Sequence, residues 1–134
     1  MKPFHLQILE ADSPFYDGAC VSLIFPAADG QYGVQAGHRN LIAAVVPGTV
    51  RFRLPDGTVR IAAVSTGMVK IEAGEVLMLV ESAERPEDID LNRAKRAAEH
   101  AKEMLLQNQD PRHYRLAKAE LARSINRLNV GRKR

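Results

Sequence analysis

The stretch Thr49-Val50-Arg51-Phe52-Arg53-Leu54-Pro55-Asp56-Gly57-Thr58 decides the fold of the first half of the chain. Its apolar residues, Val50, Phe52 and Leu54, alternate with polar ones, as a half-buried strand requires. The Pro55-Asp56-Gly57 segment supplies the residues of a tight turn, and residues 58–64 return as a second strand. We therefore predict a β-hairpin over residues 49–64.

Similar short patterns fill the rest of residues 1–85. Phe4, Leu6 and Ile8 alternate with the residues between them, and residues 69–71 and 75–80 flank a turn at Ala73-Gly74. Further turns are expected at Asp17-Gly18, Asp29-Gly30, Gly33, Gly37 and Pro47-Gly48. Many short strands separated by turns predict a β-sandwich or flattened barrel. The strand-helix alternation that is typical of a parallel sheet is absent from this sequence.

The periodicity changes after Arg85-Pro86. In the first helix predicted there, one face carries Leu91, Ala94, Ala98, Ala101 and Leu105, at spacings of three and four residues. Asp88 or Asp90 can cap its amino end. Asn108-Gln109-Asp110-Pro111 interrupts the pattern, with Asp110 as the next N-cap. The second helix carries Tyr114, Ala117, Leu121, Ile125 and Leu128 on one face.

This second helix is expected to end near Gly131, which we interpret as its C-cap. Because the connection between the helices is short, they must form an antiparallel hairpin. The predicted fold class is therefore α+β, with a β-sandwich over residues 1–85 followed by a C-terminal antiparallel helical hairpin over residues 86–134.

The packing stripe of the first predicted helix is poor in large side chains. Ala94, Ala98 and Ala101 allow close approach of two helices, but each buries little apolar area. We therefore expect a weakly stabilised hairpin that depends on the β domain or on another partner, as a conformational switch requires. An ordinary alanine-rich hairpin that never leaves the sandwich is the alternative.

Charge is distributed unevenly along the chain. Residues 1–85 contain seven Lys/Arg and nine Asp/Glu, a net charge of −2, and residues 86–134 contain twelve Lys/Arg and seven Asp/Glu, a net charge of +5. After Asp110, eight basic residues accompany one acidic residue, Glu120. Such a segment favours an acidic partner, which could be a protein, a nucleic acid, a nucleotide or a membrane surface.

No catalytic or metal-binding pattern is evident. The single cysteine, Cys20, lies in an apolar strand-like run and is interpreted as a buried small residue. The four histidines lack the spacing of a metal site, and Gly30, Gly33 and Gly37 lack the Gly-Lys-Ser/Thr ending of a phosphate loop. The chain has no apolar run long enough to span a membrane and no signal-peptide pattern, so a cytoplasmic location is expected.

Two other functional classes are weaker interpretations of these features. A nucleic-acid-binding module could use the basic last helix, but only Tyr114 in that helix could stack on a base, and the β half has no basic stripe. An enzyme on a sandwich scaffold would need converging histidines or carboxylates that the sequence spacing does not reveal.

Several motifs, taken in order, resemble the epsilon subunit family of bacterial F-type ATP synthases over essentially the whole chain. In the β half they are Phe15-Tyr16-Asp17-Gly18, Asp29-Gly30-Gln31-Tyr32-Gly33-Val34 with Gly37-His38, Pro47-Gly48-Thr49-Val50, Ser65-Thr66-Gly67-Met68 and Ala83-Glu84-Arg85-Pro86. In the helical half they are Ile89-Asp90-Leu91-Asn92-Arg93-Ala94 and Asn126-Arg127-Leu128-Asn129-Val130. Each motif is weak alone, and their order and spacing carry the resemblance.

The resemblance implies a non-catalytic central-stalk subunit of a proton-translocating F-type ATP synthase. Its expected partners are the gamma subunit and the c-ring, at the cytoplasmic face of the bacterial plasma membrane and peripheral to it. The family's loop that meets the c-ring corresponds to Gln31, Tyr32 and His38. This sequence continues with Arg39-Asn40, where many relatives have a proline.

The resemblance also implies that the extended hairpin restrains ATP hydrolysis. The residues expected to meet acidic segments of the catalytic alpha and beta subunits are the cations of the last helix: Arg112, Arg115, Lys118, Arg123 and Arg127. Attraction of this kind is strongest when the charges are desolvated between large subunits. No nucleic-acid partner is implied.

Some members of the family bind ATP through a motif of the form Ile/Leu-Asp-x-x-Arg-Ala, which residues 89–94 fit completely. The residues that would face the nucleotide are Glu84, Asp90, Arg93, Arg123 and Arg127. An arginine expected further along the first helix is replaced here by His100. Alternatively, Asp90 caps the helix and Arg93 pairs with Glu84 or Glu87. ATP would be a regulatory ligand, with no required cofactor and no metal.

Overall fold

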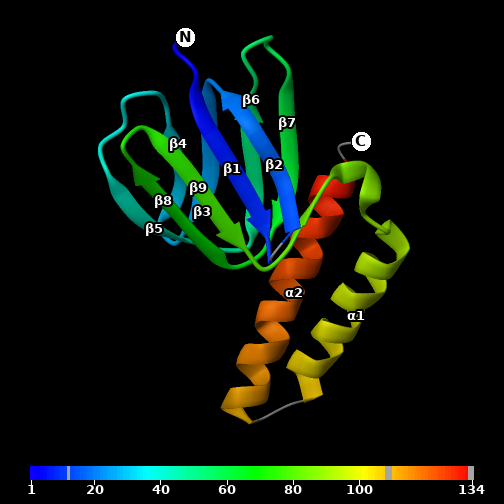
Figure 1. The fold of residues 1–134 in the computed structure, drawn as a ribbon. Helices are drawn as coiled ribbons and strands as arrows, with labels where there is room; N and C mark the ends of the chain where they lie inside the picture. The colour runs from blue at the N-terminus through cyan, green and yellow to red at the C-terminus, as the bar shows by residue number, and fades with distance from the viewer. Residues whose placement is uncertain (12, 108–109, 133–134) are drawn as a thin grey trace. The chain divides into compact units, whose positions relative to one another are not determined.

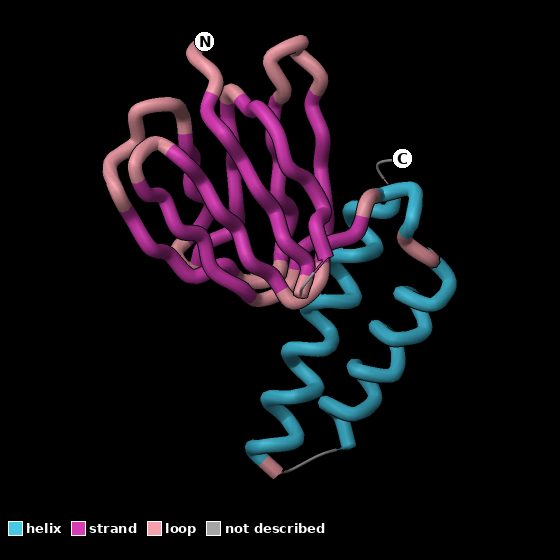
Figure 2. Tube along the Cα trace, viewed as in Figure 1, coloured by secondary structure: helices cyan, strands magenta, loops and turns pink. Residues whose placement is uncertain are grey.

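A computed structural model describes residues 1–11, 13–107 and 110–132 of the 134-residue chain. The chain divides into two compact units, Met1–Glu84 and Arg85–Arg134. Figures 1 and 2 show that strands make up the first unit and that helices dominate the second. The β-sandwich and the packed pair of C-terminal helices that the sequence predicts are both confirmed.

Two five-stranded sheets form the first unit. Sheet A has the order β2-β1-β9-β8-β5, and sheet B has the order β10-β7-β6-β3-β4. The strands are β1 (Phe4–Glu10), β2 (Ser13–Cys20), β3 (Ser22–Ala27), β4 (Gly30–Val34), β5 (Leu41–Val45), β6 (Gly48–Arg53), β7 (Val59–Val64), β8 (Gly67–Glu72), β9 (Glu75–Val80) and β10 (Ala83–Glu84).

The predicted hairpin over residues 49–64 is confirmed. β6 and β7 pair antiparallel, and Gly57 adopts a φ of 90° in the turn between them. A second tight turn joins β8 and β9 at Ala73 and Gly74, whose φ angles are 53° and 79°. Positive φ at two successive positions matches the right-handed twist of the flanking strands, so this turn favours a regular hairpin.

Two of the expected turns are wrong. Asp17-Gly18 lies inside β2, and Gly33 lies inside β4. A Cβ on Gly18 would stand 2.9 Å from the hydroxyl oxygen of Tyr16, so the tyrosine side chain would have to shift to admit it. Gly33 pairs with Ile24 of β3 in extended conformation. A glycine in the sequence is therefore not sufficient evidence of a turn, because it can also lie within a strand.

One pair of strands is parallel. β1 lies between β2, which is antiparallel to it, and β9, which is parallel to it from His5↔Glu75 to Glu10↔Val80. This pairing joins the first strand of the chain to the ninth, and it places β1 and β9 side by side at the centre of sheet A (Figure 1). Local turn chemistry does not specify such a long-range pairing.

The core of the sandwich lies between the two sheets. Its largest fully buried side chains come from strands of both: Phe25, Phe52, Leu6, Ile8, Leu23, Ile71, Met78, Val34, Val45, Val50 and Val69. Cys20 is also fully buried, as the sequence predicts, and its burial raises the pKa of the thiol. This residue is a packing element of the core and not a nucleophile.

The second unit is a pair of packed helices, α1 (Leu91–Gln107) and α2 (Pro111–Gly131), preceded by the short 3-10 helix η1 (Pro86–Asp88). Ala94, Ala98 and Ala101 are buried on α1, which confirms the alanine stripe. Asp110 caps α2 by accepting a hydrogen bond from the Arg112 backbone N–H at 2.9 Å. Residues 108 and 109, part of the predicted interruption, lie outside the described residues.

The expected packing face of α2 is only partly correct. Ala117 is buried, but Tyr114 and Ile125 are exposed, and the other buried positions are Ser124, Val130 and Gly131. The contact face of α2 therefore includes the small residues Ala117, Ser124 and Gly131. Small side chains on both helices, including the alanines of α1, allow the two helices to approach closely.

Gly131 is not a left-handed C-cap. It is the last residue of α2, and the cap that follows, Arg132, has a φ of −72°. A Cβ on Gly131 would stand 2.7 Å from Leu91 Cδ2 and 3.1 Å from Ile89 Cγ2. The glycine is explained by this close approach between the end of α2 and the start of α1, and not by a backbone conformation.

Candidate functional site

The outer face of sheet A carries an apolar row. Leu9, Leu79, Met68 and Ala44 are successive register partners across β1, β9, β8 and β5. They point away from the core, because the neighbouring residues Ile8, Val80, Val69 and Val45 are buried in it. An outward apolar row on a sheet is typical of a surface that another protein covers.

The next row on this face is mixed. Gln7, Leu77, Lys70 and Ile42 follow one another across the same four strands. Ile42 is 66% exposed on the edge strand β5. The two rows together form a surface with an apolar centre. We call its apolar residues the sheet A face: Leu9, Ile42, Ala44, Met68, Leu77 and Leu79.

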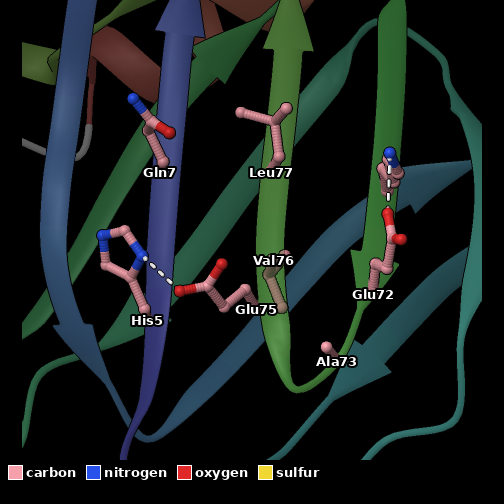
Figure 3. Close-up of a pocket in the computed structure, with 8 residues that line it drawn as sticks. His5, Gln7, Glu72, Ala73, Glu75, Val76 and Leu77 are labelled. Atoms are coloured by element: carbon pink, nitrogen blue, oxygen red, sulfur yellow. Dashed lines mark ion pairs between the residues drawn. The ribbon is translucent and has the colours of Figure 1, made fainter.

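Charged side chains border the sheet A face. Nε2 of His5 lies 2.6 Å from Oδ1 of Asp17 on β2, and its Nδ1 lies 3.7 Å from Oε1 of Glu75 on β9. Figure 3 shows His5 and Glu75 turned toward one another in one row, with Gln7 and Leu77 in the next. The hydrogen bond to Asp17 raises the pKa of His5 above its ordinary value, which favours the charged imidazolium.

A shallow cavity of about 390 Å³ lies within this border. Its lining includes His5, Gln7, Glu75 and Leu77, together with Lys70, whose Nζ lies 2.7 Å from Oε2 of Glu72. The hydrogen bond from Lys70 lowers the pKa of Glu72. An apolar centre with a charged rim is the usual composition of a protein interface.

The residues predicted for the c-ring loop lie on β4 and in the turn after it. Tyr32 packs against Phe25 with ring centroids 5.4 Å apart, and its hydroxyl lies 3.0 Å from Nε2 of His38. Nδ1 of His38 lies 2.8 Å from the carbonyl oxygen of Arg39, so in the neutral ring Nδ1 carries the proton and Nε2 accepts from Tyr32. The structure thus brings Tyr32 and His38 together, while Gln31 is exposed beside them.

A hollow of about 610 Å³ adjoins this loop. Its lining includes Ile24, Gly33, Gly37, His38 and Arg53. Gly33 has no heavy atom within 4 Å of a notional Cβ, so its missing side chain leaves the strand surface open. The loop therefore offers a concave surface with an apolar floor and a basic edge.

The cations predicted to meet the catalytic subunits all lie on α2. Arg112, Arg115 and Lys118 are exposed, and Arg123 and Arg127 are half-buried. At about 100° per residue, the five fall within one half of the helix circumference, opposite the buried Ala117 and Ser124. Among the charged residues of α2 the basic ones predominate, and they share one side of the helix.

The predicted nucleotide residues divide between the two units. Glu84 belongs to β10, and Asp90, Arg93, Arg123 and Arg127 belong to the hairpin. Since Gly131 packs on Leu91, the carboxyl end of α2 lies beside the start of α1. Arg93 and Arg127 are therefore at the same end of the hairpin, with Arg123 one helical turn away along α2.

Asp90 has a structural role. Its Oδ1 accepts a hydrogen bond from the Arg93 backbone N–H at 3.0 Å, which lowers the pKa of the carboxyl. It therefore caps α1, as the sequence interpretation allows. Arg93 is exposed in the first turn, and His100 is exposed about two turns further along the same side of α1.

Sequence reasoning did not find the sheet A face. A signal was present, because residues 76–80 are a continuous apolar run and not an alternating one. Such a run predicts a strand whose two faces are both covered. The described residues contain no cluster of three or more side chains suited to a metal ion, and neither helix among them is long and apolar enough to cross a membrane.

Two family profiles cover almost the whole chain. Residues 3–86 match the β-sandwich domain of the ATP synthase delta/epsilon chain, and residues 87–131 match its long α-helix domain. The chain belongs to the ATP synthase epsilon chain family. Membership identifies it as a non-catalytic, epsilon-type subunit of the F-type ATP synthase, a class of central-stalk subunits.

Full-length relatives agree with this assignment. The chain is 36% identical to the ATP synthase epsilon chain of Ruminiclostridium cellulolyticum, with 100% of this chain and 99% of the relative covered. It is 33% identical to that of Ruminococcus albus, with 100% of each covered. Among solved structures, a chain of the Euglena gracilis mitochondrial ATP synthase has the same fold, with a TM-score of 0.83, 20% identity, and 92% of this epsilon chain and 78% of that chain covered.

Proposed function

We propose that this epsilon chain binds the gamma subunit in the central stalk through the sheet A face. The observation that carries the proposal is the outward apolar row Leu9, Leu79, Met68 and Ala44, in which Ala44 is exposed and the other three residues are only half-buried. The Gln31–His38 loop would contact the c-ring, with the hollow beside Gly33 and His38 receiving a polar loop of the ring. These contacts would hold the subunit peripherally at the cytoplasmic face of the bacterial plasma membrane.

Co-purification with the gamma subunit of the same organism tests the stalk proposal. A stable complex is expected at micromolar concentrations, because a covered apolar centre with a charged rim supports specific association. Separate elution of the two chains would refute it. For the loop, Tyr32→Ala should weaken binding of a gamma-bound chain to the isolated c-ring, and Tyr114→Ala, an exposed tyrosine in the hairpin, is the matched control.

The hairpin would restrain ATP hydrolysis through the basic face of α2. The support is the half-circumference of cations on α2 together with the small contact area that Ala94, Ala98 and Ala101 provide on α1. Because the hairpin buries little apolar area, separating it from its present contacts costs only a few kcal/mol. A contact with another subunit can offset a free energy of this size.

A charge-removal triple variant tests this role. Replacing Arg112, Arg115 and Lys118 with glutamine should relieve inhibition of hydrolysis in a reconstituted complex of alpha, beta and gamma subunits. A control that replaces Lys95, Arg96 and Lys102 of α1 removes the same charge from the other helix and should leave inhibition unchanged. Equal effects of the two variants would mean that net charge, and not the α2 face, is responsible.

ATP would bind through the residues that the resemblance implies, which are Asp90, Arg93, Arg123 and Arg127 of the helical unit and Glu84 of β10. The support is the complete match of residues 89–94 to the family's motif, and the placement of Arg93 and Arg127 at one end of the helix pair. Guanidinium groups suit phosphate oxygens through bidentate hydrogen bonds. Calorimetry with ATP on the wild type and on Arg93→Ala decides this, with Lys102→Ala as control. No binding heat for the wild type at millimolar ATP would remove the proposal.

A further inference from the structure

Glu120 is the one acidic residue in the sequence after Asp110. Each of its two carboxylate oxygens accepts a hydrogen bond from another residue of α2. Oε2 accepts a hydrogen bond from Nη2 of Arg123 at 2.8 Å. Oε1 accepts a longer one, at 3.4 Å, from the hydroxyl of Ser124. The carboxylate is therefore held by two neighbours on its own helix, one turn away.

Ser124 adds a weak contact to this surface ion pair. Its side chain is buried on the contact face of α2, with 2% of the residue exposed. The hydroxyl thus approaches the carboxylate from the packed side of the helix, while Arg123 approaches from the solvent side with 42% of its side chain exposed. Glu120 lies between them, and the Arg123 guanidinium is turned back along α2 toward it.

An anion that needs Arg123 must therefore compete with Glu120. The ion pair uses Nη2 of Arg123, so phosphate oxygens that bind through this nitrogen share it with the carboxylate or displace the carboxylate, whereas the remaining guanidinium N–H groups are not part of this ion pair. The carboxylate also repels an approaching polyphosphate at short range. Ion pairs at this spacing on exposed helix surfaces are modest, so the competition is a tuning effect and not a block.

We propose that Glu120 is an internal competitor that lowers the affinity of Arg123 for the polyphosphate of a nucleotide. This inference rests on the proposed nucleotide site, and it adds the residue that would set its strength. Because Arg123 and Ser124 follow Glu120 by three and four residues on α2, the carboxylate lies beside the guanidinium whenever the helix is formed.

Calorimetry with ATP on the full chain tests the proposal through a double-mutant cycle. Glu120→Gln should tighten binding about two- to five-fold, as expected from losing one competing ion pair and one nearby negative charge. Glu99→Gln on α1 removes the same charge without touching Arg123 and should have a smaller effect. In the Arg123→Gln background, Glu120→Gln should do no more than Glu99→Gln.

The outcomes separate two kinds of failure. If the wild type binds ATP but Glu120→Gln matches Glu99→Gln, or keeps its full effect without Arg123, the competitor role is overturned and the nucleotide site stands. If neither the wild type nor Glu120→Gln binds ATP at millimolar concentration, the nucleotide site itself is wrong. Circular dichroism of each variant confirms that the helices are intact.

Discussion

Asp90 caps helix α1 through Arg93, because its carboxylate accepts the Arg93 backbone N–H at 3.0 Å. Both residues also belong to the motif expected to contact ATP, so one carboxylate is assigned a structural and a ligand-binding role. Asp90→Asn keeps an N-cap acceptor but removes the charge, and Asp90→Ala removes both. The two variants can therefore separate the roles.

We expect Asp90→Ala to reduce the helicity and the melting temperature of the chain, and Asp90→Asn to leave both nearly unchanged. If the carboxylate also contacts the nucleotide, Asp90→Asn should still weaken ATP binding in calorimetry. The pKa of Asp90 is lowered in the folded chain, so its contribution is present above the ordinary value of 3.8 and is lost as the pH falls through the folded pKa. Unaltered helicity of Asp90→Ala would show that the cap is unimportant.

The sheet A face predicts which sandwich variants lose the gamma subunit. Leu79→Gln places a polar group at the centre of the apolar row and should weaken binding of gamma by about ten-fold or more, the size of effect seen at central interface positions. Val59→Gln, an exposed apolar position on β7 of sheet B, is the matched control and should bind normally.

Melting curves of both variants must first show a folded sandwich, since Leu79 is half-buried. Affinity can then be measured by titrating labelled gamma with each chain. Normal binding by folded Leu79→Gln would place the gamma contact elsewhere on the sandwich.

Gly67 predicts a large stability effect at the start of β8. A Cβ at this position would overlap the carbonyl oxygen of Leu79 and stand 2.8 Å from Val80 Cα, and backbone atoms cannot rotate away. Gly67→Ala should therefore destabilise the chain by about 2 kcal/mol or more. Gly33→Ala meets nothing within 4 Å and should change stability by no more than about 0.5 kcal/mol. Urea unfolding of both variants measures the difference, and equal stabilities would contradict the packing described for β8 and β9.

His5 predicts a pH dependence of the sandwich. Because its folded pKa is raised above the ordinary value of 6.5 by Asp17, its charged contacts contribute stability that is fully present below 6.5 and is lost as the pH rises through the folded pKa. Glu75 faces the same ring, and the neighbouring Glu72 is paired with Lys70.

Titration of the His5 ring protons by NMR should give a pKa above 6.5, and Asp17→Asn should lower it. As the pH rises from 6.5 through the folded pKa of His5, the melting temperature of the wild type should fall relative to that of His5→Gln. A His5 pKa at or below 6.5 in the wild type would show that the contact with Asp17 does not persist in solution.

Local patterns predicted most elements of this fold. The alternation around Val50 and Phe52, the Ala73-Gly74 turn, the cap at Asp110 and the buried Ala94, Ala98 and Ala101 all depend on neighbours within a few residues. Each follows from the period of a strand or helix, or from the chemistry of one turn.

The features that the sequence did not predict depend on distant partners. Gly18 and Gly131 look like a turn and a cap in isolation, but Gly18 lies within β2, and the contact with Leu91 explains Gly131. The parallel pairing of β1 with β9 and the outward row through Leu79 depend on which strands become neighbours. Because pairing sets the exposed face, the sheet A face could not be assembled from the order of residues alone.

ATP hydrolysis by a reconstituted complex of alpha, beta and gamma subunits tests the central claim most directly. Full-length chain and a chain lacking residues 87–134 would be compared at saturating concentration, with binding to gamma measured in the same samples. We expect both chains to bind, because the sandwich has its own core, and only the full-length chain to suppress hydrolysis. Equal hydrolysis with both bound chains would contradict the regulatory role of the hairpin.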